Sequence, residues 1–217
     1  MGIQKHTVRL YLVRHGETTQ NREMRYLGTQ DTLLTPAGMI QASQVAEALS
    51  QIPIKVVLSS PLRRTAETAA RIQAACKIEL RLDSRLREGS FGSWEGLTRS
   101  EVMGLSEQDR QNLALWESDP SIAPPGGESI ENIQKRMIAL ADELCREFSG
   151  SSVVLVSHVG PIKALIAASM GVSLHSSRRL FLDPCTISVV EWGAEPLVRL
   201  LNSHAHLGWL SARWMVE

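Results

Sequence analysis

Four side chains that could bind and transfer a phosphoryl group stand at or just beyond the ends of short apolar runs. Arg14 and His15 follow one such run, Arg64 lies a few residues beyond a second, and His158 follows a third. Guanidinium groups are planar and permanently charged, and they suit bidentate contacts with phosphate oxygens. Two arginines and two histidines that meet in one pocket would form a site for a dianion, and phosphate fits best.

The elements that must position these residues are predicted from hydrophobic periodicity. Short β-rich or apolar runs predict strands at 8–13, 54–58, 152–156, 186–191 and 197–201, and an alternating pattern predicts a short edge strand at 78–82. Segments with apolar residues at helical spacing predict helices, at 36–50, about 61–76, 130–148 and 160–170. Strands that alternate with helices indicate a layered α/β fold with a mostly parallel sheet. Ligands bind beyond the carboxyl ends of such strands, where the sequences LVRHG, VLSSP and VLVSH lie.

Composition limits the partners and the compartment. Among 217 residues, 23 Lys and Arg balance 23 Asp and Glu, which argues against a nucleic-acid binder that works through bulk charge. No apolar run approaches the length of a membrane span, and the polar start, Met1 to Thr7, is too short for a secretory signal. Cys76, Cys145 and Cys185 are far apart, so neither disulfides nor a zinc site is indicated. We expect a cytoplasmic protein that uses no metal and no cofactor.

The chemistry of such a pocket would need a nucleophile and an acid. One histidine could attack phosphorus as a neutral imidazole, while the other stays protonated and stabilises the equatorial oxygens. The leaving oxygen then needs a proton from a carboxylic acid. Glu88, in an apolar, glycine-rich stretch, is the best donor, and Glu17, directly after the Arg-His-Gly turn, is its rival.

Several segments, in order along the chain, resemble the histidine phosphatase (phosphoglycerate mutase-like) superfamily. They are LVRHGET at 12–18, GTQDTLLTPAG at 28–38, SSPLRRTAET at 59–68, the stretch 86–96, GGES at 126–129 and VSHVG at 156–160. The resemblance implies a three-layer α/β/α sandwich that forms a single domain over residues 1–217. The irregular segment at about 86–127 reads as a cap-like excursion over one end of the sheet.

The resemblance also implies roles for individual residues. His15 would be the nucleophile that becomes phosphorylated, Arg14, Arg64 and His158 would hold the phosphoryl oxygens, and Glu88 would protonate the leaving group. The candidate substrate-binding residues are Asn21, Gly28, Thr29, Val159 and His206. Two departures from the family pattern, Gln20 in place of a frequent tryptophan and Val159 in place of a frequent glycine, concern the pocket wall.

The function expected from these residues is a metal-independent phosphomonoesterase of the histidine acid phosphatase type that acts on a small phosphorylated metabolite. A mutase that returns the phosphoryl group to a product alcohol is the alternative, and a non-catalytic phospho-ligand binding module is a third class. The segment Val102 to Pro125 contains a single basic residue, Arg110, which favours the phosphatase. Sugar phosphates, phosphoglycerate-like acids, α-ribazole phosphate and phosphoserine remain open as substrates. The sequence also leaves a homodimer open.

Overall fold

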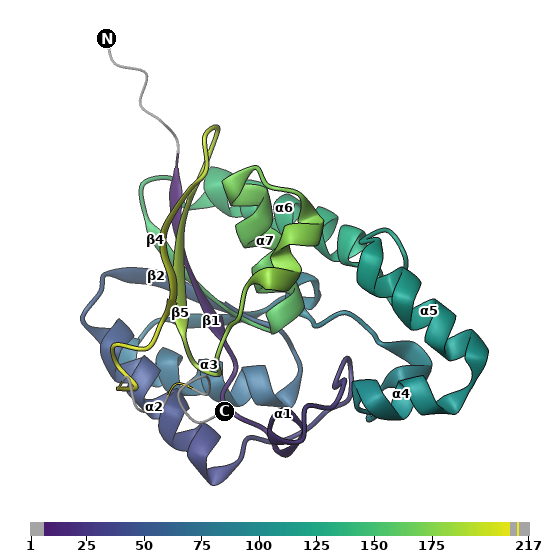
Figure 1. Cartoon of the computed structure of the whole chain (residues 1–217). Helices are drawn as coiled ribbons and strands as arrows, with labels where there is room; N and C mark the ends of the chain where they lie inside the picture. The colour runs from purple at the N-terminus through teal and green to yellow at the C-terminus, as the bar shows by residue number, and fades with distance from the viewer. Residues whose placement is uncertain (1–6, 209–211, 213–217) are drawn as a thin grey trace.

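A single twisted sheet forms the centre of the computed structural model, which describes residues 7–208 and 212 (Figure 1). Within them, six strands lie in the order β3-β2-β4-β1-β5-β6. Their bounds are Val8–Arg14 (β1), Ile54–Ser59 (β2), Glu79–Leu82 (β3), Ser152–Ser157 (β4), Ile187–Trp192 (β5) and Leu197–Ser203 (β6). Residues 1–6, which make up most of the polar segment Met1 to Thr7 of the sequence analysis, lie outside the described residues.

The register of the central strands brings the chemically interesting ends together. β1 pairs with β4 in parallel, with Val13 opposite Val156 and Arg14 opposite Ser157. β2 is parallel to β4 and to β3, whereas β5 is antiparallel to both β1 and β6. β5 therefore runs against the other five strands, and the prediction of a mostly parallel sheet is confirmed. Because paired parallel strands end at one edge, the residues after β1 and β4 become neighbours.

Helices cover both faces of the sheet and give the predicted three layers. On one face, α2 (Pro36–Ser50) and α3 (Arg63–Cys76) bury apolar side chains such as Val45 and Ile72 against β2 and β4. On the other, α6 (Ile130–Glu147) and α7 (Val159–Met170) contribute Leu140 and Leu165 to a second core. These cores join the sheet to both helix pairs, which fixes the strand ends as one rigid platform.

The helix starts follow local sequence signals, with one difference from prediction. The Thr35 hydroxyl accepts a hydrogen bond from Gly38 N at 3.0 Å, and Pro36 occupies the first helical position. The predicted start of α3 near position 61 is wrong, since the helix begins later, at Arg63. Its N-cap, Leu62, is extended (φ −67°, ψ 140°), and the amide of Leu62 is held by the Ser60 hydroxyl at 3.3 Å.

The segment between β3 and α6 packs around a small apolar cluster of its own. It contains η1 (Ser84–Leu86), η2 (Gly92–Trp94), α4 (Arg99–Leu105) and α5 (Glu107–Ser118). A cluster of buried side chains consists of Trp94, Val102, Leu113 and Trp116. The Trp94 and Trp116 rings meet edge to face, with their centroids 6.0 Å apart. In Figure 1 this teal segment extends to one side of the sheet. Two short elements, α1 (Thr19–Arg22) and η3 (Leu174–Arg179), complete the surroundings of the site.

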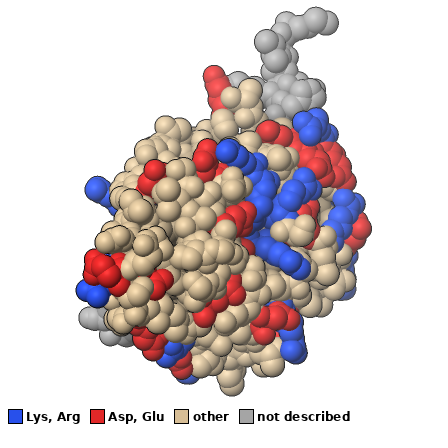
Figure 2. Space-filling view, turned by 90° about the vertical axis from the view of Figure 1, so that its right-hand side faces the viewer, with Lys and Arg blue, Asp and Glu red and all other residues tan. Residues whose placement is uncertain are grey.

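Charged side chains on the face shown in Figure 2 lie interspersed rather than as a field of one sign. Several arginines pair with carboxylates, among them Arg85 with Glu143 and Arg99 with Glu117, at 2.7 and 2.6 Å. Exposed pairs of this kind contribute little to stability, about 0–1 kcal/mol each. Across the described residues, none of the helices combines the length and apolar character needed to cross a bilayer.

Candidate active site

A cavity of about 520 Å³ opens beyond the carboxyl ends of β1 and β4. The predicted catalytic residues Arg14, His15, Arg64 and Glu88 all line it, and His158 lies directly beneath. The His15 and His158 ring centroids are 5.1 Å apart, with the ring planes tilted by 59°. These five residues come from four separate segments of the chain, so the fold brings together side chains that lie far apart in the sequence.

His15 is held in one tautomer. Its backbone N–H donates to Ser157 O at 3.0 Å, and its ring Nδ1 lies 2.7 Å from Gly16 O. A carbonyl oxygen can only accept, so Nδ1 carries the hydrogen and Nε2 keeps its lone pair in the neutral ring. Burial, followed by the charges of Arg64 and Arg14, lowers the pKa of His15 well below the usual 6.5. The imidazole is therefore neutral at physiological pH, as a nucleophile must be.

The backbone approaches closely behind this histidine. A Cβ atom on Gly16 would lie 2.5 Å from Gly38 O, at the start of α2. The Gly16 amide donates to the Thr68 hydroxyl on α3 at 3.1 Å. The glycine of the Arg-His-Gly turn is thus required by packing, and it lets the turn sit between two helices.

His158 is fully buried, and its ring lies beside that of His15. Its Nε2 atom lies 2.9 Å from the Ser60 hydroxyl, and within the described chain its buried Nδ1 atom has no hydrogen-bond partner. Burial, Arg64 and His15 lower its pKa well below 6.5, which opposes the protonated state expected from the sequence. A phosphate dianion bound beside the ring would raise the pKa of His158, because a nearby negative charge stabilises the protonated imidazole.

Arg14 and Arg64 are buried, and each is anchored at the end of its guanidinium by backbone carbonyls. Arg14 Nη1 donates to Leu182 O at 2.6 Å, while Arg64 donates to Gln30 O at 2.6 Å and Gly28 O at 2.8 Å. Burial lowers the pKa of Arg64 to about 10, so it stays charged at neutral pH. The buried Nε–H of Arg64 makes no hydrogen bond within the described residues and is a suitable donor for a phosphate oxygen.

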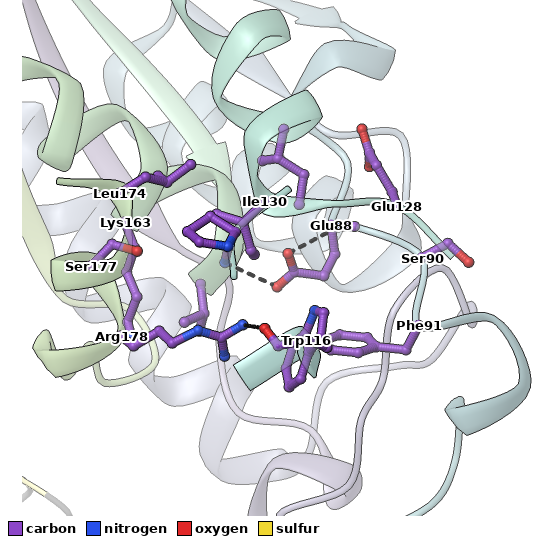
Figure 3. A pocket seen from close by; sticks show the side chains of 15 residues that line it. Glu88, Ser90, Phe91, Trp116, Glu128, Ile130, Lys163, Leu174, Ser177 and Arg178 are labelled. Carbon is purple, nitrogen blue, oxygen red and sulfur yellow. Dashed lines mark hydrogen bonds between the residues drawn. The ribbon is translucent and has the colours of Figure 1, made fainter. Parts of the chain in front are cut away.

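Glu88 reaches the cavity from the loop after η1, and its carboxylate is fixed by two backbone amides. Gly160 N donates to Oε2 at 3.2 Å, and Gly89 N donates to Oε1 at 3.0 Å (Figure 3). Glu17, the rival acid, instead accepts from the Thr35 hydroxyl at 2.8 Å and does not line the cavity.

The close contact between Gly160 and Glu88 makes a specific prediction. A Cβ atom at position 160 would lie 2.4 Å from Glu88 Oε1, the far end of a flexible side chain. We expect Gly160→Ala to fold normally but to slow hydrolysis of an alkyl phosphate by about 10-fold, because the added methyl group displaces Glu88, the predicted proton donor. Gly104→Ala is the matched control, since nothing lies within 4 Å of its added Cβ. Equal rates for the two variants in a steady-state assay would contradict this role of Gly160.

The predicted substrate-binding residues divide into two groups. Asn21, Gly28 and Val159 line the cavity. Asn21 Oδ1 accepts from Thr18 N at 3.1 Å, so its amide nitrogen is the group left to donate. Thr29 donates from its backbone and hydroxyl to Glu95 Oε1, at 2.9 and 3.0 Å, and His206 lies 2.8 Å from Cys185 O. Neither of these last two residues lines the cavity.

Several lining residues were missed by the sequence reasoning. Arg178 is half-buried, and its guanidinium group lies 4.2 Å from the centroid of the Trp116 ring. Tyr26 and Phe181 line the catalytic cavity, and Lys163 lines an adjoining chamber. The sequence carries one signal that could have singled out Lys163, which is the only charged residue of α7, VGPIKALIAASM.

Comparisons with known proteins agree with this geometry. The family model of the histidine phosphatase superfamily (branch 1) matches residues 10–203. A bifunctional protein of Mycobacterium tuberculosis is 35% identical over 95% of this chain, which spans 57% of that protein's length. A probable phosphoglycerate mutase of Shigella dysenteriae is 37% identical over 97% of this chain and 91% of its own.

Solved structures of similar fold include named phosphatases. A mycobacterial glucosyl-3-phosphoglycerate phosphatase has a TM-score of 0.82 and 30% identity, and the match covers 91% of this chain and 99% of the other. A phosphoserine phosphatase of Entamoeba histolytica has a TM-score of 0.82 and 30% identity, over 93% and 100% of the two chains. The chain belongs to the histidine phosphatase superfamily.

Proposed function

We propose that this protein is a phosphomonoesterase that hydrolyses a small phosphorylated metabolite through a phosphohistidine on His15. The observation that carries the proposal is the state of His15, a buried neutral imidazole whose Nδ1 is tied to Gly16 O. Its Nε2 lone pair shares a cavity with two buried guanidinium groups and a carboxyl group. The named phosphatases among the similar structures support the same reaction class.

The proposed reaction has two displacements at phosphorus. In the first, His15 Nε2 forms a bond to phosphorus, the bond to the leaving oxygen breaks, and Glu88 gives its proton to that oxygen. Arg14, Arg64 and His158 stabilise the negative charge on the equatorial oxygens. In the second, Glu88 takes a proton from water, whose oxygen attacks phosphorus and releases His15 and inorganic phosphate.

A mutase would use the same first displacement and return the phosphoryl group to an alcohol. The relatives named as probable phosphoglycerate mutases keep this alternative open. The two reactions differ in whether water or a product alcohol receives the phosphoryl group from the phosphohistidine. A phosphoglycerate isomerisation assay beside a phosphate-release assay separates the two.

The proposal is tested by phosphate release across a panel of phosphomonoesters, with EDTA and orthovanadate as probes. The positive charge in the cavity comes from side chains, so EDTA should leave the rate unchanged. Among the described residues, no cluster of three His, Cys, Asp or Glu side chains is arranged as a metal site. Orthovanadate mimics five-coordinate phosphorus, so we expect inhibition at low concentration. A strict requirement for Mg²⁺, or no release from any member of the panel, would overturn the proposal.

Other expectations stay predictions from the sequence. They are the single domain with an excursion at 86–127, the cytoplasmic location, the absence of a nucleic-acid partner and the possible homodimer. The proposed substrate-binding roles of Thr29 and His206 also stay predictions, and the positions of these residues outside the cavity weigh against direct contact.

A further inference from the structure

A second chamber, of about 150 Å³, adjoins the catalytic cavity. The two share Glu88, Phe91 and Val159 in their walls, so the proton donor stands at the boundary between them. In Figure 3, Leu174, Lys163, Ser177 and Arg178 lie along one side of the chamber, with Glu88 and Phe91 along the other. A leaving group that receives its proton from Glu88 would therefore extend into this chamber.

Most of the chamber wall is apolar. Ile130 and Ile133 of α6, Leu174 of η3 and the Phe91 and Trp116 rings line it. A cavity of this volume holds one benzene-sized group. The walls would thus bury a compact apolar part of a leaving group, at about 25 cal/mol per Å² of apolar area removed from water.

Two cations break the apolar lining, and they differ in how they are held. Arg178 stacks on the Trp116 ring and donates from Nη2 to Trp116 O, so it forms part of the wall. Lys163 projects from an otherwise uncharged helix and is partly buried. In the described part of the chain its ammonium group has no hydrogen bond and no ion pair within 4 Å. A partly buried ammonium group of this kind favours an anionic partner.

The carboxylates of the chamber are already engaged. Glu128 pairs with Arg136 through two contacts of 3.0 Å. Glu88 is held by the amides of Gly89 and Gly160. Neither carboxylate contacts the Lys163 ammonium group within ion-pair distance, so the charge of Lys163 remains available to a ligand.

We propose that this chamber binds the leaving-group half of the substrate, a compact apolar segment that ends in a carboxylate paired with Lys163. The inference rests on the proposed phosphomonoesterase function and names its substrate class, a carboxylate-bearing phosphomonoester. The phosphoryl group lies on His15 and the carboxylate on Lys163, so the two anionic ends are bound on opposite sides of Glu88. Neutral esters of the same size would leave the ammonium group without a partner.

The charge of Lys163 also gives the preference a pH dependence. Burial, followed by the charge of Arg14, lowers its pKa from 10.5 to about 8. Among the other charged groups that face it, Arg178 lowers the pKa further and Glu88 raises it, while Glu128 is neutralised by Arg136. The ammonium form is present below pH 8 and is lost above it. A carboxylate preference that depends on Lys163 should therefore fall as the pH rises through 8.

The test uses pairs of substrates of equal length. Phosphate esters of ω-hydroxy acids are compared with alkyl phosphates that lack only the carboxylate, over a series of chain lengths, by kcat/KM. We expect one length to show the greatest carboxylate preference in the unmodified protein. Lys163→Met, which fits an apolar wall, should reduce that preference by about 10- to 100-fold. It should also abolish the decline of the preference above pH 8.

The matched control is Lys135→Met, on the exposed side of α6, where Lys135 pairs with Glu131 at 2.9 Å. This variant should leave the preference unchanged, and Lys163→Arg should retain part of it. If Lys163→Met hydrolyses both substrate series with the original ratio, the inference is wrong although the protein is a phosphatase. If the unmodified protein releases no phosphate even from an activated aryl phosphate, the proposed function itself is wrong.

Discussion

His15→Ala is expected to lose essentially all turnover, by at least about 10⁴-fold, because the proposed mechanism places the covalent bond to phosphorus on this residue. No other described side chain in the cavity can replace it. His158 is turned toward Ser60 through Nε2, at 2.9 Å. The fold should survive, since the ring lies at the cavity end of β1 and its backbone bond to Ser157 O does not need the side chain. Circular dichroism and a thermal melt check this point.

The intermediate itself can be trapped. Protein mixed with a ³²P-labelled substrate and quenched should carry label that is stable to base and labile to acid, as expected for phosphohistidine. The label should be absent in His15→Ala and present in His175→Ala, whose histidine lies exposed on η3. Label that survives acid, or that remains in His15→Ala, would place the covalent step on another residue.

The positions of the catalytic side chains could be predicted because they are set by local signals and by one topological rule. Arg14 is the last residue of β1 and His158 directly follows β4, and parallel strands place such residues at one edge of the sheet. The register that sets Arg14 opposite Ser157 then makes His15 and His158 neighbours. The tautomer of His15 could not be predicted, because it depends on the 2.7 Å contact with Gly16 O.

The chamber beside the site could not be predicted, because no short stretch of sequence encodes it. Its wall combines α5, α6, α7, η3 and the loop that carries Glu88. Arg178 and Trp116 are 62 positions apart, yet the guanidinium group of one lies on the ring of the other. Periodicity shows which face of a helix is apolar but not which residue of another helix meets it. Such contacts require the packed structure.

The positions of the two candidate acids, Glu17 and Glu88, also depend on tertiary contacts that the sequence does not reveal. Glu17 and Glu88 both stand in glycine-containing loops near motif residues, and the sequence favours Glu88 without excluding Glu17. In the structure Glu17 binds the Thr35 hydroxyl at the start of α2, whereas Glu88 lines the cavity. A loop carboxylate has several possible partners, and tertiary packing selects among them.

For Glu88→Gln, we expect a loss of about 10²- to 10⁴-fold on substrates with alkoxide leaving groups, which need a proton as the bond breaks. An activated aryl phosphate should lose far less in the phosphorylation step, because its leaving group is a weak base. The amide keeps one oxygen, which can accept from either Gly160 N or Gly89 N, so the variant retains one of the two backbone contacts that fix the side chain.

The informative quantity is therefore the ratio of the two losses, measured by the pre-steady-state burst for the aryl ester and by steady-state kcat/KM for the alkyl ester. Glu17→Gln is the matched control, and it should affect both substrates equally, through the contact with Thr35. An equal loss on both substrates in Glu88→Gln would mean that Glu88 is structural or acts only in dephosphorylation. Full activity in Glu88→Gln, together with a selective loss on the alkyl ester in Glu17→Gln, would assign the proton to Glu17. Since Gly160→Ala displaces the same carboxylate, its smaller loss should show the same dependence on the leaving group.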